Sequence, residues 1–148
     1  MIAVVQRVLN ASVSVDSPPY NKSIEAGLCV FLGVEEGDDS SHATWMAKKL
    51  SNLRIFKDEN EKMNCSLLDI KGELLLISQF TLVGDCSKGN RPSFIHAARP
   101  EIAEPLVQLV SEILQVEHHI AVKNGVFGAM MEIQITNDGP VTLIVQRD

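Results

Sequence analysis

Residues 28–34 read LCVFLGV, an unbroken apolar run that lies between Gly27 and Gly37. A second run, LLLISQF, occupies residues 74–80. A strand with one solvated face alternates apolar and polar residues, so short continuous runs bounded by turn residues are typical of strands covered on both faces. The two runs therefore predict the centre of a sheet with packed layers on either side.

Further strands are predicted on both sides of these runs. Residues 2–8 predict a strand, and residues 11–15 alternate between apolar side chains and serines, which is the period of a half-buried strand. The SPPYNK stretch at 17–22 predicts a turn or surface loop. Two more strands are predicted to close the chain, at about 130–136 and 141–146.

Two helices are predicted from apolar residues at helical spacing. The first extends from about residue 40 to 52, and the second begins at Pro100, a residue type that is favoured in the first turn of a helix. Strands and helices in this order predict an α+β fold, with two helices packed on one side of the sheets. We expect residues 1–148 to form one domain.

The bulk composition restricts the classes of function. Thirteen basic and nineteen acidic residues give a net charge of −6, which counts against an extended nucleic-acid surface but not against contact with a few terminal nucleotides. The cysteines are odd in number and far apart, and neither they nor the four histidines form a disulfide or metal pattern. The start of the chain lacks the basic-then-apolar order of a signal peptide, so we expect a cytoplasmic protein. Because no ligand pattern is present, we expect no metal or other cofactor.

The second run ends in the polar segment Ser78-Gln79-Phe80-Thr81-Leu82. Catalytic groups are common where strands end in loops, and consecutive backbone N–H groups at such a place could face an oxyanion. A strand end with polar caps is the ordinary alternative. Thr81 as a nucleophile would need a base, and no histidine is near it in the sequence, so a pocket-lining hydroxyl is the safer interpretation.

The segment TNDGPVT at 136–142 joins the last two predicted strands, and a hairpin turn is its ordinary interpretation. The Gly139-Pro140 pair is unusual there, because proline lacks an N–H group. A cis bond before Pro140, which costs little, would turn two carbonyl groups the same way and suit them to an ammonium group.

Five segments of the chain together resemble the D-aminoacyl-tRNA deacylase family. They are MIAVVQRVLNASVSV at 1–15, SQFTL at 78–82, KGNRPSF at 88–94, NGVFGAMM at 124–131 and NDGPVT at 137–142. The resemblance implies a metal-free homodimeric hydrolase that cuts the ester between a D-amino acid, or glycine, and the 3′-terminal adenosine of tRNA. It implies that L-aminoacyl-tRNA is spared, so that the enzyme serves the quality control of translation.

The resemblance also assigns roles to residues. It implies that Ser78, Gln79, Phe80 and Thr81 form the catalytic segment, and that Gly139-Pro140 is a cis pair that enters the site of the other subunit and holds the substrate's ammonium group. Phe127 matches the region that receives the terminal adenosine, and Arg7 matches an arginine that supports the Gly-Pro pair.

Two mechanisms and two other functions stay open at this point. Either a water attacks the ester while the Phe80 N–H, with that of Gln79 or Thr81, holds the oxyanion and the ribose 2′-hydroxyl assists, or Thr81 is a covalent nucleophile. The rival functions are a Thr- or Cys-dependent esterase or amidase for small molecules and a non-catalytic binding module.

Overall fold

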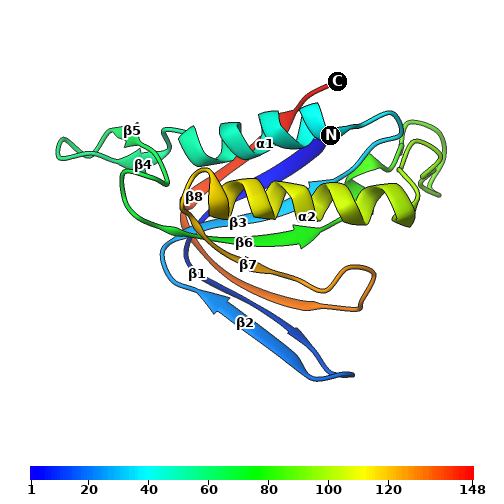
Figure 1. Cartoon of the computed structure of the whole chain (residues 1–148), viewed down its shortest axis with the longest axis horizontal. Coiled ribbons are helices and arrows are strands. Elements are labelled where there is room, and N and C mark those ends of the chain that lie inside the picture. The colour runs from blue at the N-terminus through cyan, green and yellow to red at the C-terminus, as the bar shows by residue number, and fades with distance from the viewer.

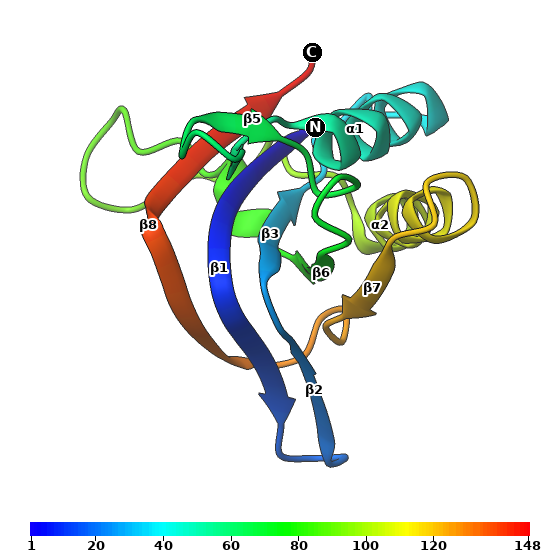
Figure 2. The same ribbon diagram turned by 90° about the vertical axis from the view of Figure 1, so that its left-hand side faces the viewer.

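A curved sheet with two helices on one of its faces forms the protein (Figures 1 and 2). The computed structural model describes residues 1–148. The elements in chain order are β1 (Ile2–Val15), β2 (Tyr20–Ile24), β3 (Gly27–Gly33), α1 (Ser40–Asn52), β4 (Phe56–Lys57), β5 (Met63–Cys65), β6 (Glu73–Ser78), the short 3₁₀ helix η1 (Phe80–Val83), α2 (Pro100–Val116), β7 (Ala121–Asn124) and β8 (Glu132–Gln146). The α+β class and the two helices on one side are confirmed.

The two apolar runs form the middle of the six-stranded sheet. β3 and β6 pair in parallel, with Leu32 opposite Ser78, and β7 continues the sheet parallel to β6. β1 pairs antiparallel with β3, β2 and β8. Because parallel neighbours end at the same edge, β3 and β6 bring their carboxyl ends together.

Alternate residues of the central strands enter two separate hydrophobic clusters. Leu28 and Val30 belong to the larger cluster, which lies between the sheet and the helices, whereas Cys29 belongs to a smaller cluster on the other face. β6 divides in the same way, with Leu74 and Leu76 toward the helices. The prediction of strands covered on both faces is therefore confirmed.

Gly27 permits the close approach of β3 and β6. A Cβ atom at this position would lie 1.8 Å from the carbonyl oxygen of Glu73, so no other residue type fits without a shift of the backbone. The glycine that bounds the first apolar run in the sequence is thus required where the two central strands meet.

The last two predicted strands form one strand, so the hairpin interpretation of residues 136–142 is wrong. β8 runs without reversal from Glu132 to Gln146 and pairs with β1 on both sides of the Gly-Pro pair. The register shifts between Gln6 and Asn10, which absorbs the irregular residues as a bulge. β1 is likewise a single strand of 14 residues, where the sequence suggested two segments.

The predicted helices agree closely with α1 and α2. Asp39 caps α1, where its side chain accepts hydrogen bonds from the backbone N–H groups of Ser41 and His42. Pro100 occupies the start of α2, as predicted. The turn or surface loop predicted at 17–22 is too long, because the turn ends at Pro19 and β2 begins at Tyr20. The strands β4, β5 and β7 were not predicted, because each is too short for a clear period.

Neither helix has both the length and the apolar character that a membrane-spanning helix requires.

Candidate active site

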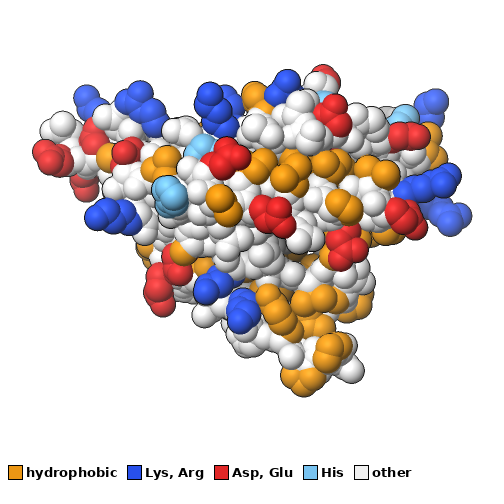
Figure 3. Space-filling model, viewed as in Figure 1, with side chains coloured by type: hydrophobic (Ala, Val, Ile, Leu, Met, Phe, Trp, Pro, Cys, Tyr) orange, Lys and Arg blue, Asp and Glu red, His pale blue; other side chains and the backbone are white.

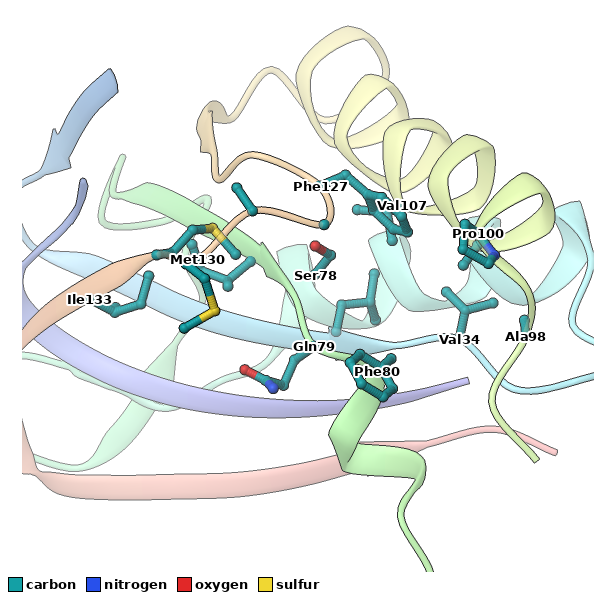
Figure 4. Close-up of a pocket in the computed structure, with 16 residues that line it drawn as sticks. Val34, Ser78, Gln79, Phe80, Ala98, Pro100, Val107, Phe127, Met130 and Ile133 are labelled. Atoms are coloured by element: carbon teal, nitrogen blue, oxygen red, sulfur yellow. The ribbon is translucent and has the colours of Figure 1, made fainter. Parts of the chain in front are cut away.

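A cavity of about 600 Å³ opens beside the carboxyl ends of β3 and β6 (Figure 4). Twelve of its sixteen lining residues are hydrophobic. The lining comes from β3, the end of β6, the start of α2 and the segment before β8, and comprises Leu32, Val34, Ile77, Ser78, Gln79, Phe80, Ala98, Pro100, Ala103, Val107, Phe127, Gly128, Ala129, Met130, Met131 and Ile133. A concave, mainly apolar site with a few polar groups is typical of a ligand pocket.

The predicted catalytic segment lies at this cavity. Ser78 is the last residue of β6, and its hydroxyl points toward Phe127 across the cavity (Figure 4). The Gln79 side chain leaves the strand on the opposite side. Phe80 is 59% exposed, and its ring packs edge-to-face with that of Phe94 with 5.2 Å between centroids. Three of the four predicted catalytic residues therefore line one cavity.

The backbone N–H groups of the segment differ in whether they are free. The Gln79 N–H donates to the carbonyl oxygen of Leu32 at 2.8 Å, which continues the pairing of β3 with β6. The N–H groups of Phe80 and Thr81 donate to no acceptor in the chain, because they are the first two of η1 and have no preceding turn. Of the three predicted donors to an oxyanion, Phe80 and Thr81 remain available and Gln79 does not.

Thr81 lies outside the cavity lining. Its side chain is exposed, and its hydroxyl oxygen accepts a hydrogen bond from the side-chain amide of Gln79. An amide N–H is a donor and cannot take the hydroxyl proton, so this contact does not activate Thr81 as a nucleophile. The contact holds the start of η1 against the end of β6.

No lining residue of the cavity carries a titratable side chain. Cys29 is a candidate nucleophile for a cysteine-dependent mechanism, but its side chain is buried on the face of the sheet away from the helices. Burial raises the pKa of its thiol to about 12. No three His, Cys, Asp or Glu side chains are grouped so that they could hold a metal ion.

Phe127 lies on the segment that connects β7 to β8 and faces Ser78 and Val107 (Figure 4). The segment is held by the Met131 sulfur, which accepts from the Val126 N–H at 3.4 Å. Phe127 therefore lies beside the predicted catalytic segment, in the lining of the same cavity.

A second, polar hollow of about 430 Å³ adjoins the cavity and shares Ser78, Val107 and Phe127 with it. Glu104 and Glu112, on one face of α2, contribute carboxylates to its lining. The two carboxylates make this side of the cavity acidic.

Gly139 and Pro140 do not reach the cavity of their own chain. Both are exposed on β8, and the bond between them is cis. Ile133 does line the cavity, but Gly139 follows it by six residues, which is about 20 Å of extended strand. The two predicted halves of the site are therefore apart within one chain.

Arg7 holds the residue that precedes the pair. It is 4% exposed, and its guanidinium donates to the carbonyl oxygen of Asp138 at 3.1 Å and to that of Ile55 at 2.6 Å. The guanidinium also lies 3.2 Å from the Asp138 carboxylate. Gly139 has a φ of +123°, and a Cβ atom there would lie 3.0 Å from an Arg7 nitrogen. Arg7 thus lies directly against Asp138 and Gly139.

The sequence did not identify several residues around the cavity. Met130, Met131 and Ile133 line it from the approach to β8, and Ala98 and Pro100 line it from the start of α2. Phe94 contacts Phe80 from outside the lining. The segment KGNRPSF contains Phe94 and the segment NGVFGAMM contains Met130 and Met131, but neither indicated which side chains face the cavity.

Comparisons with known proteins bear on this arrangement. The family model described as D-Tyr-tRNA(Tyr) deacylase matches residues 4–146. A protein of Geotalea daltonii named D-aminoacyl-tRNA deacylase is 53% identical over 146 residues, which cover 99% of this chain and 96% of that protein. A deacylase of Bacillus cytotoxicus is 49% identical, with 99% of each chain covered.

A solved structure also has this fold at clear sequence similarity. The chain of the c-Myc DNA Unwinding Element Binding Protein superposes with a TM-score of 0.91 and 39% identity, covering 100% of this chain and 99% of that one. Because the family model matches residues 4–146 and the relatives are 53% and 49% identical in sequence, the chain belongs to the D-Tyr-tRNA(Tyr) deacylase family, a family of hydrolases that act on ester bonds.

Proposed function

We propose that this protein is a D-aminoacyl-tRNA deacylase, which hydrolyses the ester between a D-amino acid, or glycine, and the 3′-terminal adenosine of tRNA. The observation that carries the proposal is the pair of unengaged N–H groups, of Phe80 and Thr81, beside an apolar cavity in a chain of this family. The cytoplasm, where tRNA is charged, is the proposed location, and removal of D-amino acids from tRNA is the proposed role.

The proposed reaction starts from an ester carbonyl placed at the mouth of the cavity. A water oxygen attacks the carbonyl carbon, and the oxygen that gains negative charge accepts from the Phe80 and Thr81 N–H groups. The ribose 2′-hydroxyl relays the proton of the water, the bond to the 3′-oxygen breaks, and the 3′-oxygen takes the proton. Substrate assistance is supported by the cavity, whose own lining offers no titratable side chain as a base.

Each complete site is proposed to use two copies of the chain in a homodimer. One copy supplies Ser78, Gln79 and Phe80, with Phe127 against the adenosine, and the other supplies Gly139 and Pro140. Support comes from the separation of these groups within one chain and from the exposure of both Phe80 and the Gly-Pro pair. Arg7 holds the preceding carbonyl of Asp138, so the pair is presented from a fixed support.

Selection against L-amino acids follows from steric exclusion in this proposal. The carbonyl groups of Gly139 and Pro140 accept hydrogen bonds from the substrate's ammonium group, and the ester is fixed beside Phe80. The side chain of a D-amino acid then points outward, whereas that of an L-amino acid would collide with the Gly-Pro backbone. Glycine passes because a hydrogen atom collides with nothing.

Mixed dimers test the two-chain site. Phe80→Pro removes one N–H donor, and Gly139→Ala adds a methyl group against Arg7, so each variant alone is expected to be nearly inactive on D-tyrosyl-tRNA. When equal amounts are unfolded and refolded together, half of the dimers are mixed and each keeps one intact site, so about a quarter of the wild-type activity should return. No recovery, in a sample whose mixed dimers are verified by mass spectrometry, would contradict the shared site.

The rival esterase or amidase that uses Thr81 is not favoured by any contact of that residue. Its hydroxyl accepts from the Gln79 amide and lies outside the cavity lining. Turnover of simple tyrosine ethyl esters at a rate comparable to D-tyrosyl-tRNA would support that rival.

A further inference from the structure

Residues 85–99, the basic loop, lie between η1 and α2, and the loop reaches the cavity through Ala98, which lines it, and Phe94, which packs against Phe80. We propose that Lys88, Arg91 and Arg99 of this loop bind the backbone phosphates of the tRNA 3′ strand. The inference rests on the proposed function and adds the surface that holds the RNA next to the ester.

The position of the basic loop places its cations beside the reacting end of the substrate. Arg99 stands between Ala98 and Pro100, which both line the cavity (Figure 4). Phe94 packs against Phe80 with 5.2 Å between ring centroids. A strand of RNA whose terminal ester reaches Phe80 must therefore pass close to this loop.

The charge of the basic loop is opposite to that of the rest of the chain. It contains three cations and one carboxylate, Asp85, so ten basic and eighteen acidic residues remain elsewhere. Lys88, Arg91 and Arg99 are exposed, and none of them takes part in an ion pair or a side-chain hydrogen bond. Figure 3 shows Lys and Arg side chains at the end of the molecule where this loop and the start of α2 lie.

The base of the loop is fixed while its tip is free. Asp85 and Ser93 exchange two backbone hydrogen bonds, of 2.8 and 3.0 Å, and the Ala98 N–H donates to the Val34 carbonyl at 3.0 Å. The Asp85 carboxylate accepts from Ser87, and hydrogen bonding by this serine lowers the pKa of Asp85. All residues from 86 to 92 are exposed. Cations on a loop with a fixed base are held near the cavity and can still adjust to a phosphate.

The other side of the cavity is unsuited to phosphate. Glu104 and Glu112 line the adjoining polar hollow, and their carboxylates repel an anionic strand. With one acidic and one basic side, the cavity directs the RNA backbone toward the basic loop. This arrangement also explains how a chain of net charge −6 can act on tRNA, because few phosphates need to be contacted.

The test compares two substrates that differ in phosphate. The triple variant Lys88→Ala, Arg91→Ala, Arg99→Ala is assayed with D-tyrosyl-tRNA and with D-tyrosyl-adenosine, an ester that has no phosphate, over a series of KCl concentrations. For the tRNA we expect kcat/KM to fall about tenfold at physiological salt, and the slope of log kcat/KM against log salt to become shallower by about two, since each single-strand phosphate contact contributes roughly 0.7. Turnover of D-tyrosyl-adenosine should stay at the wild-type level.

The matched control removes three cations from the opposite end of the molecule. Lys48, Lys57 and Lys62 lie on α1 and around β4 and β5, and their change to alanine should leave both the rate and the salt slope with tRNA unchanged. The inference is overturned if the loop variant keeps the wild-type salt slope, if the control variant loses as much, or if the loop variant loses D-tyrosyl-adenosine turnover to the same extent as tRNA turnover. Failure of the wild-type protein on both substrates would instead refute the proposed function and the inference with it.

Discussion

The carboxyl end of β6 and the middle of β8 carry the two halves of the proposed site, and they are built differently. At the end of β6 the backbone is fixed by the hydrogen bond from the Gln79 N–H to the Leu32 carbonyl. The groups offered to a substrate beside the cavity are the N–H donors of Phe80 and Thr81. At Gly139-Pro140 the chain is exposed and is held from beneath by one buried arginine. The difference suggests that chemistry belongs to the first region and selection to the second, and the following variants separate the two.

The largest effect is expected from Phe80→Pro, which removes a donor to the oxyanion. Gln79 has φ −145° and ψ 82°, which is outside the helical region that a following proline disfavours, and proline is accepted at the first position of a helical turn. We expect kcat on D-tyrosyl-tRNA to fall by about 10²–10³. Single-turnover assays measure it, with Phe80→Ala as the control that removes the ring and keeps the N–H; equal losses in both variants would show that the ring, and not the N–H, is what matters.

A somewhat smaller loss is expected from Gly139→Ala, because a side chain at φ +123° is strained and its methyl group would meet Arg7 at 3.0 Å. Displacement of the carbonyl groups should lower kcat/KM for D-tyrosyl-tRNA by about 10². Gly37→Ala is the matched control, since Gly37 also has a positive φ, +93°, but a Cβ there meets nothing within 4 Å. If both variants lose the same activity, the effect is one of backbone strain and the selection role is refuted.

Arg7→Met is expected to affect stability first. It removes donors from the Ile55 and Asp138 carbonyls, in a side chain that is 4% exposed, so the free energy of unfolding should fall by about 2–4 kcal/mol. Urea unfolding measures this change. If Arg7 supports the pair, the folded variant should also have a lower kcat/KM for D-tyrosyl-tRNA; an unchanged kcat/KM in folded protein would limit Arg7 to a structural role.

Thr81→Ala should have the smallest kinetic effect, below about fivefold, because the N–H of this residue is kept and only a hydroxyl outside the cavity is lost. The kcat for D-tyrosyl-tRNA measures it, and Thr81→Ser is the conservative comparison. A loss of more than a thousandfold in the alanine variant, restored by serine, would favour the covalent nucleophile.

The thiol of Cys29 should be unreactive toward alkylating reagents in the native protein. Burial raises its pKa to about 12, so almost no thiolate forms below pH 10. Iodoacetamide at pH 8 should therefore label the exposed Cys86 and leave Cys29 unlabelled in the native protein, as peptide mass spectrometry can determine. Rapid labelling of Cys29 together with loss of activity would revive a cysteine-dependent mechanism.

The parts of the fold that were predictable are those in which local pattern and burial agree. The central strands were evident from continuous apolar runs, and α1 and α2 from apolar spacing with Asp39 and Pro100 at their starts. The continuity of β8 was not evident from the sequence, because Asn-Asp-Gly-Pro has the composition of a turn. Pairing with β1 on both sides of a bulge keeps the strand continuous through that segment, and such long-range pairing leaves no local mark.

For the site, the sequence indicated which residues take part better than it indicated their hydrogen bonds and their positions around the cavity. The sequence pointed to residues 78–81, Phe127, Gly139, Pro140 and Arg7 through resemblance to a family. It could not show that the Gln79 N–H is engaged while that of Phe80 is free, since this depends on the register of β3 against β6. Nor could it show that Met130 and Ile133 line the cavity, because that depends on how the segment after β7 folds over it.

The most direct test of the proposed function is hydrolysis of D-tyrosyl-tRNA, L-tyrosyl-tRNA and glycyl-tRNA side by side, with a chelator present. We expect rapid loss of the D-tyrosyl and glycyl esters, while the L-tyrosyl ester decays no faster than it does without the protein. Equal turnover of the D and L esters, or no turnover of either, would contradict it.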